Sequence, residues 1–178
     1  MQTHTGNVVR TASTSSPPNL RRGTAADLSA VNAVIERAVM AWKLPERVKR
    51  LALPMYLYSA HDLEHVEIVI AGNGAVGVLG FAAWEPAIER DCAQGRRGLQ
   101  LHGIYVDPDQ QRRGVGARLL SAAAAAAREQ GYDGLLVKAQ ADAEGFFAAQ
   151  GLQRLAVEDI RRDYPHRFWL DLTARQAA

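Results

Sequence analysis

The sequence has little cysteine and no long apolar run, and each shortage excludes a class of protein. Cys92 is the single cysteine among 178 residues, so an intramolecular disulfide and a thiolate zinc site of the usual kind are both excluded. A chain without disulfides fits a reducing compartment, and we expect a cytoplasmic protein. A membrane-spanning helix needs about 18–20 apolar residues, and no stretch approaches that length, so we expect no membrane partner.

An excess of charge of one sign is also missing. The chain carries 21 Lys and Arg against 19 Asp and Glu, a formal net charge of +2. Nucleic-acid-binding domains usually carry a basic surplus, so we expect no nucleic-acid partner. The hydrophobic fraction of 48% is enough for the core of a single domain of this length.

The first nineteen residues differ from the rest of the chain. Residues 1–19 are rich in Ser, Thr and Pro and contain no acid. An organelle transit peptide has a similar composition, but no amphipathic helix is visible, and no continuous apolar stretch indicates a secretory signal. We therefore interpret residues 1–19 as a disordered N-terminal tail and expect one domain over residues 20–174.

Apolar periodicity and turn residues divide this domain into helices and strands. Helices are expected over 25–39, 45–53, 115–130 and 143–150, and strands over 66–71, 75–84, 99–106, 134–139, 152–157 and 168–172. Thr24 and Asp27 have the spacing of a capping box before the first helix, and Gly72-Asn73-Gly74 predicts a hairpin turn. Residues 99–139 read as strand–helix–strand, so these two strands should be parallel within a mixed sheet covered by helices.

The segment after the expected strand 99–106 carries the most specific signal. Gly114 and Gly116 stand where a long helix begins, beside Arg112 and Arg113. Glycines let phosphate oxygens approach the main chain, and a helix N-terminus favours negative charge. The spacing matches neither the Lys-containing phosphate loop nor the dinucleotide fingerprint. Taken alone, it fits a phosphate or pyrophosphate site, a nucleotide-binding module, or a purely structural tight turn.

Two sequence blocks resemble the GNAT acetyltransferase superfamily. Residues 111–116 read Q-R-R-G-V-G and are similar to its Q/R-x-x-G-x-G/A signature, and residues 140–152 resemble its later block N-x-x-A-x-x-F-Y-x-x-x-G-F through Ala143, Phe146, Gly151 and Leu152. The resemblance implies the GNAT fold, an α/β architecture. This fold has a mixed, mostly antiparallel sheet of six to seven strands, about four helices and a central V-shaped splay between two parallel strands.

The resemblance also implies an activity and a donor. Members of the family transfer an acetyl group directly from acetyl-CoA to a primary amine, here of a small molecule or a peptide, without a metal, and homodimers are frequent among them. Backbone groups of the signature would hold the pyrophosphate, and the preceding strand would pair with pantetheine. The residues implied for these contacts are Gln111, Arg112, Arg113, Gly114, Val115, Gly116 and Ala117 for the pyrophosphate, and Ile104 and Val106 for pantetheine.

An ammonium group must lose a proton before it can attack a thioester, so a base is needed. Our first candidate is His102, which alternation places on one face with Gln100 and Ile104, and whose place before the signature is similar to that of a histidine in arylalkylamine N-acetyltransferases. Glu85, at the end of the preceding expected strand, is the second candidate, acting directly or through water. The alternatives are a half-buried strand histidine and a solvated loop acid.

The sequence departs from the family pattern at two positions. Phe147 replaces the tyrosine that often protonates the departing CoA thiolate, and Gln140 replaces the asparagine of the same block. Phenylalanine has no hydroxyl and cannot donate a proton. Alternation directs Tyr105 away from His102, so solvent or another tyrosine would have to serve, from Tyr56, Tyr58, Tyr132 and Tyr164. The departure keeps open an alternative, a non-catalytic acyl-CoA-binding or sensor protein.

Two further groups of residues have more than one interpretation. His61 and His65 stand four apart with Asp62 and Glu64 between them, but no third ligand can be identified before the next strand, so we expect a polar surface connection and no metal. An apolar, aromatic set could line a pocket for an apolar or aromatic amine, although packing between helices is the favoured interpretation. That set is Met40, Trp42, Leu44, Met55, Tyr56 and Tyr58.

Overall fold

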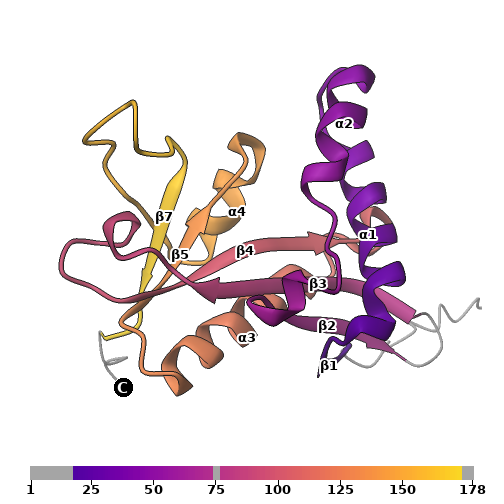
Figure 1. The fold of residues 1–178 in the computed structure, drawn as a ribbon, viewed down its shortest axis with the longest axis horizontal. Helices are drawn as coiled ribbons and strands as arrows, with labels where there is room; N and C mark the ends of the chain where they lie inside the picture. Colours follow the sequence, from indigo (N-terminus) through magenta and orange to yellow (C-terminus); the bar gives the residue numbers. More distant parts are fainter. Residues whose placement is uncertain (1–17, 74–76, 174–178) are drawn as a thin grey trace, which may run out of the picture.

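The computed structural model describes residues 18–73 and 77–173, which form a seven-stranded sheet with helices on both faces (Figure 1). The α-helices are α1 Leu28–Met40, α2 Glu46–Ala52, α3 Val115–Glu129 and α4 Glu144–Ala149. The strands are β1 Asn19–Arg22, β2 Glu67–Asn73, β3 Gly77–Pro86, β4 Gly98–Val106, β5 Gly134–Lys138, β6 Gln153–Arg154 and β7 Arg167–Asp171. Their order across the sheet is β1–β2–β3–β4–β5–β7–β6.

The expected mixed sheet is confirmed. β4 and β5 are parallel, with Gly98 opposite Gly134, and α3 connects them. The other neighbouring pairs of strands in the described sheet are antiparallel. A crossover helix between two parallel strands was the arrangement that the pattern of residues 99–139 predicted.

Three local expectations were wrong or only partly testable. β1 was not predicted as a strand, because its four residues are mostly exposed, include two arginines and show no apolar alternation. This strand begins at Asn19, the last residue of the segment interpreted as a disordered tail. The rest of that prediction is not tested, because residues 1–17 lie outside the described part of the chain. β6 is two residues long instead of the expected six, and the chain then loops away. Gly72 and Asn73 still belong to β2, and residues 74–76 of the expected turn region are not described.

The helix α1 covers one face of the sheet (Figure 1). The capping box at its start is confirmed, since the Asp27 carboxylate accepts hydrogen bonds from the Thr24 backbone N–H at 2.9 Å and from the Thr24 hydroxyl at 3.0 Å. A single 3-10 turn, Ala25–Asp27, leads into the helix. The buried side of α1 packs on residues of β2 and β3 and forms one hydrophobic core, which contains Val31, Val34, Ile35, Val39, Ile68, Ile70, Phe81 and Ala83.

The helix α3 covers the opposite face and forms the larger core. Its alanine-rich sequence lets the backbone approach the sheet closely, as expected. The buried residues of this core include Leu119, Leu120, Ala123, Ala127, Trp84, Leu99, Leu101, Leu135 and Val137. Among the described residues, no helix is long and apolar enough to span a lipid bilayer.

Candidate active site

A break in the pairing of β4 opens the centre of the sheet. The parallel pairing of β4 with β5 ends at Leu101 and Val137, although β4 continues to Val106. The next residue of β4, His102, is also skipped in the pairing with β3, where Ala83 faces Gly103 and Trp84 faces Leu101. His102 is therefore the extra residue of a β-bulge, which bends its strand and re-aims side chains. This divergence of two parallel strands is the splay that the resemblance implied.

The bulge changes which side chains share a face. Leu101 and Ile104 both contact the core under α3, whereas Tyr105 packs on the side of α1, stacked on Phe81 with ring centroids 5.3 Å apart. Strict alternation had placed His102 and Ile104 on one face and had directed Tyr105 away from His102. Both expectations are wrong, because a one-residue insertion reverses the alternation after it.

The backbone of β4 beyond the bulge has one side that no strand pairs, where the Gln111 side-chain amide donates a long hydrogen bond of 3.5 Å to the Val106 carbonyl. The N–H of Asp107 donates to the carbonyl of Leu79 on β3 at 2.9 Å, and alternation then directs the Tyr105 backbone groups toward β3 as well. The N–H and C=O of Ile104 and Val106 consequently point to the other side, where β5 has ended. An extended ligand could pair with these groups as an added strand would.

The loop between β4 and α3 has the geometry of an anion site. Arg112 is the one non-glycine residue with positive φ in the described structure, at 60°, and Gly114 follows at 80° as the N-cap of α3. Left-handed residues set among right-handed ones turn consecutive N–H groups toward one point, and the first helical N–H groups lack intrahelical acceptors. A Cβ at Gly114 would meet no atom within 4 Å. The space beside Gly114 is thus open, as a pyrophosphate cradle requires.

Other residues hold this loop in place. Asp107 accepts hydrogen bonds from the Asp109 N–H at 3.1 Å and from the Arg37 Nε of α1 at 2.8 Å. Val115 is buried in the core, so it contributes only backbone groups to the cradle. Gly116 has a packing role in addition to the cofactor contact expected of it, since a Cβ there would lie 3.3 Å from the ring of Phe146. Its missing side chain lets α3 and α4 approach each other.

The remaining cradle residues agree with a site on the surface. Gln111, Arg112 and Arg113 are exposed and Ala117 is half-buried. The guanidinium of Arg113 contacts the Gln110 side chain at 3.4 Å. The structure therefore presents two exposed arginines, one of them in contact with Gln110, beside the N-terminus of α3, which is a suitable arrangement for a diphosphate.

His102 and Glu85 are brought together, with a third residue that the sequence did not single out as their partner. The Glu85 carboxylate lies 3.7 Å from His102 Nε2, and the Tyr58 hydroxyl lies 3.1 Å from His102 Nδ1. Glu85 belongs to β3, opposite Gln100, so it is not a loop acid. Tyr58 is 7% exposed, and its burial raises the pKa of its phenol, which stays protonated at neutral pH. The His102 side chain is 46% exposed, so solvent or a ligand reaches it.

The partner residue Tyr58 is held by the core under α1 and by a pair of hydrogen bonds to Asn32. Its ring lies edge-on to Phe81, with centroids 5.9 Å apart. Its backbone N–H donates to the side chain of Asn32 at 2.9 Å, and the Asn32 amide donates back to the Tyr58 carbonyl at 2.8 Å. The only signal in the sequence was the aromatic run at 55–58, since a pairing between residues 44 positions apart leaves no local pattern.

The structure shows how the candidate proton donors lie relative to His102. Phe147 is buried against Phe168 and Phe146, and it has no group to donate. Tyr132 lies beneath the guanidinium of Arg97, 5.5 Å from it, beside the start of β5 and away from the splay. Tyr105 is on the His102 side of the sheet, and burial raises the pKa of its phenol.

The aromatic set of residues 40–58 is divided in the structure. Tyr58 is buried and Trp42 and Tyr56 are half-buried with their rings edge to face at 5.2 Å, but Leu44 and Met55 are 45% and 84% exposed. Packing between helices, the favoured interpretation, is thus wrong for Leu44 and Met55. Gln140, just after β5, donates a hydrogen bond to the Tyr56 hydroxyl at 3.2 Å. This bond joins the segment after α2 to the far side of the splay.

Comparison with known proteins agrees with this geometry. The model of the acetyltransferase (GNAT) family matches residues 34–152. A curated relative from Pseudomonas paraeruginosa, an L-methionine sulfoximine/L-methionine sulfone acetyltransferase, is 32% identical over 89% of this chain and 92% of its own length. Among solved structures, a PaiA N-acetyltransferase from Thermoplasma acidophilum in complex with coenzyme A has a TM-score of 0.68 at 12% identity, covering 86% of this chain and 98% of that one.

A second similar structure is that of a GNAT family acetyltransferase from Brucella melitensis in complex with acetyl-CoA. Its TM-score is 0.61 at 17% identity, and the match covers 86% of this chain and 87% of that one. These two likenesses support the fold, and the family match and the curated relative support the activity. With the splayed strands and the signature loop in place, the chain belongs to the acetyltransferase (GNAT) family and is an acetyl-CoA-dependent N-acetyltransferase.

Proposed function

We propose that this protein acetylates the primary amine of a small amino acid that resembles methionine sulfoximine or methionine sulfone. The observation that carries the proposal is the relative from Pseudomonas paraeruginosa, which acts on these compounds and aligns over 89% of this chain. An alignment of that extent includes both the signature loop and the segments that flank the splay. A free amino acid is therefore favoured over a protein terminus or a peptide lysine.

The residues present fit acetyl-CoA. The open turn at Gly114, the free N–H groups at the start of α3 and Arg112 and Arg113 would hold the pyrophosphate. The backbone of Ile104 and Val106, on the side of β4 that no strand pairs, would hold the pantetheine arm, with the exposed Gln111 side chain turning away from the Val106 carbonyl. When bound, acetyl-CoA supplies the activated acetyl thioester.

His102 and Glu85 are proposed to receive the proton of the substrate ammonium group. A proton on His102 would be flanked by an oxygen at each ring nitrogen, Tyr58 at 3.1 Å from Nδ1 and Glu85 at 3.7 Å from Nε2. Both oxygens stabilise the charged imidazolium, and the 3.7 Å separation leaves the Glu85 contact free to tighten or to include a water. Their position at the bulge, where β4 and β5 part, supports this role.

The acceptor would lie beside the bridge between Tyr56 and Gln140. A sulfone or sulfoximine group carries strong hydrogen-bond acceptors on an otherwise apolar chain. The Gln140 amide and the Tyr56 hydroxyl are donors set next to the ring of Trp42, which combines a polar contact with an apolar wall. We therefore propose that Gln140, which replaces the asparagine of the family block, takes part in substrate selection.

Calorimetric titration and turnover test the proposal in sequence. Acetyl-CoA and CoA should bind and ATP should not; binding of ATP without CoA would overturn the cradle. Release of CoA thiol should then be faster with methionine sulfoximine and methionine sulfone than with methionine or a lysine peptide. Faster turnover of the lysine peptide would contradict the proposed substrate class while leaving the donor intact.

A further inference from the structure

The connection between Tyr58 and β2 brings together three side chains of the types that serve as metal ligands. It contains a 3-10 turn, Asp62–Glu64. Backbone hydrogen bonds fix this turn, from the Glu64 N–H to the His61 carbonyl at 3.1 Å and from the His65 N–H to the Asp62 carbonyl at 3.0 Å. The Asp62 carboxylate is engaged by the backbone and hydroxyl of Ser59 at 2.6 and 2.7 Å. The turn thus presents His61, Glu64 and His65 together, so Glu64 is the third candidate ligand that could not be identified from the sequence.

The ligand atoms of these three residues are close to one another. One ring nitrogen from each histidine and one carboxylate oxygen of Glu64 all lie within 4.8 Å of each other. His61 Nδ1 is 3.4 Å from the Glu64 Oε1, and the two imidazole rings stand edge to face at 5.8 Å. Ligands at about 2.0–2.2 Å from a tetrahedral Zn²⁺ are separated by about 3.3–3.6 Å. The His61–Glu64 pair already has this spacing, and the His65 nitrogen lies within 4.8 Å of both.

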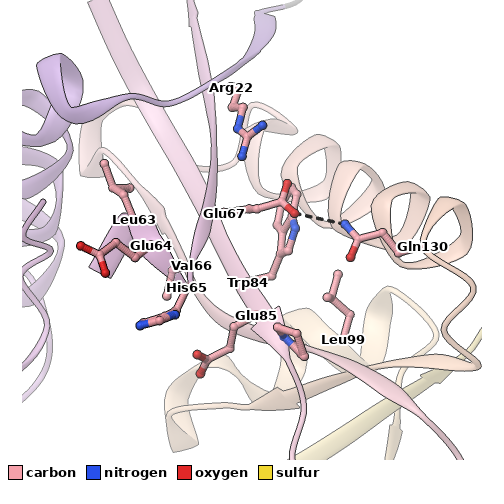
Figure 2. A pocket seen from close by; sticks show the side chains of 11 residues that line it. Arg22, Leu63, Glu64, His65, Val66, Glu67, Trp84, Glu85, Leu99 and Gln130 are labelled. Carbon is pink, nitrogen blue, oxygen red and sulfur yellow. Dashed lines mark hydrogen bonds between the residues drawn. The ribbon is translucent and has the colours of Figure 1, made fainter. Parts of the chain in front are cut away.

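The surroundings favour a cation at this position. Glu64 and His65 also line a cavity of about 280 Å³ beside β2 and β3, which Figure 2 shows with the side chains of Glu67 and Glu85. Three carboxylates face this cavity against a single arginine, Arg22. The Glu67 carboxylate is held by the Gln130 amide at 3.2 Å, so it cannot easily turn away. A positive ion would reduce the repulsion among these acids.

We propose that His61, Glu64 and His65 form a binding site for a divalent transition metal of the Zn²⁺ class, with water in the fourth position. Two imidazoles and one carboxylate suit Zn²⁺, Ni²⁺ or Cu²⁺, whereas Mg²⁺ and Ca²⁺ require mainly oxygen ligands. All three side chains are exposed, so the ion enters without any opening of the fold. The site does not depend on acetyl transfer, and its test needs no turnover.

The test is a calorimetric titration of the tag-free full chain with Zn²⁺ after chelator treatment. One ion should bind, and His61→Ala and His65→Ala should each weaken binding at least tenfold, since loss of even an outer-shell partner typically costs about 10–100-fold. His166→Ala is the matched control, because His166 contacts the Glu144 carboxylate but belongs to no group of three metal-binding side chains among the described residues. It should bind Zn²⁺ as the wild type does.

A thermal melt supplies a second readout on the same proteins. Zn²⁺ that binds only the folded chain raises Tm by mass action, so Tm should rise for the wild type and for His166→Ala but not for His65→Ala. His61 and His65 are exposed, so their replacement should leave the fold intact, whereas His166 is half-buried beside Glu144; melts of all variants without Zn²⁺ check their folding directly. Zn²⁺ affinity unchanged in both His61→Ala and His65→Ala, or no binding by the wild type, would overturn the proposal.

Discussion

Replacement of His102 by glutamine tests the proposed base most directly. Glutamine retains a polar side chain of similar length but cannot take up a proton near neutral pH. General-base catalysis typically contributes a factor of about 10²–10⁴, or about 2.7–5.4 kcal/mol of transition-state stabilisation at 1.36 kcal/mol for each tenfold change. We expect His102→Gln to lose kcat by a factor in this range. The fold should persist, because the His102 side chain is 46% exposed and its contacts with Tyr58 and Glu85 are at the surface of the splay rather than in a core.

The assay is the rate of CoA thiol release at saturating acetyl-CoA and amine between pH 6 and 9. The wild-type kcat should change with pH over this interval, and the variant should lose that dependence along with its rate. Affinity for acetyl-CoA should be unchanged, since the cradle lies in a different segment, and His166→Gln serves as a histidine control. A His102→Gln kcat within about threefold of the wild type, or a wild-type kcat that is flat from pH 6 to 9, would remove His102 from the mechanism.

Three further predictions concern the cradle, the core and acid stability. Gly114→Val and Gly95→Val both place a branched residue at positive φ, 80° and 71°, in open space, so each should lose about 1–2 kcal/mol of stability. Only Gly114→Val should also weaken acetyl-CoA binding, by about tenfold or more. Equal affinities of the two variants by calorimetry would refute the cradle. Gly134→Ala places a Cβ 2.1 Å from the Trp169 ring, so denaturant unfolding should show a loss of about 1–3 kcal/mol or more, and an unchanged midpoint would contradict the packing. The Arg21 guanidinium, aided by Thr24, holds the pKa of Asp27 well below its usual range. The stabilisation by the Asp27 carboxylate is therefore present above about pH 4 and lost as the pH falls below it. Asp27→Asn should thus be less stable than the wild type at pH 7, and a difference in stability that grew on acidification would contradict the lowered pKa.

Much of the fold could be read from local patterns. The capping box at Thr24, the alanine-rich helix α3 and the crossover that makes β4 and β5 parallel each depend on residues close together in the chain. β1 could not be read in this way, because its four residues have no apolar face and become a strand only through pairing with β2. An edge strand of this kind gains its structure from its neighbour.

The candidate site shows the same division. The sequence by itself determined the signature loop, since the glycine and arginine positions of the proposed anion cradle are nearly consecutive and their backbone conformations are local. It also named His102 and Glu85, but not their geometry.

Only the tertiary structure decided which side chains meet. Tyr58 reaches His102 from 44 residues away, and Gln140 reaches Tyr56 from 84 residues away. The bulge at His102 depends on how β4 pairs with β3. It places Tyr105 on the α1 face of the sheet, together with His102, whereas strict alternation predicted the opposite face. Alternation assumes an unbroken pleat, and whether a pleat is broken is settled between strands, not within one.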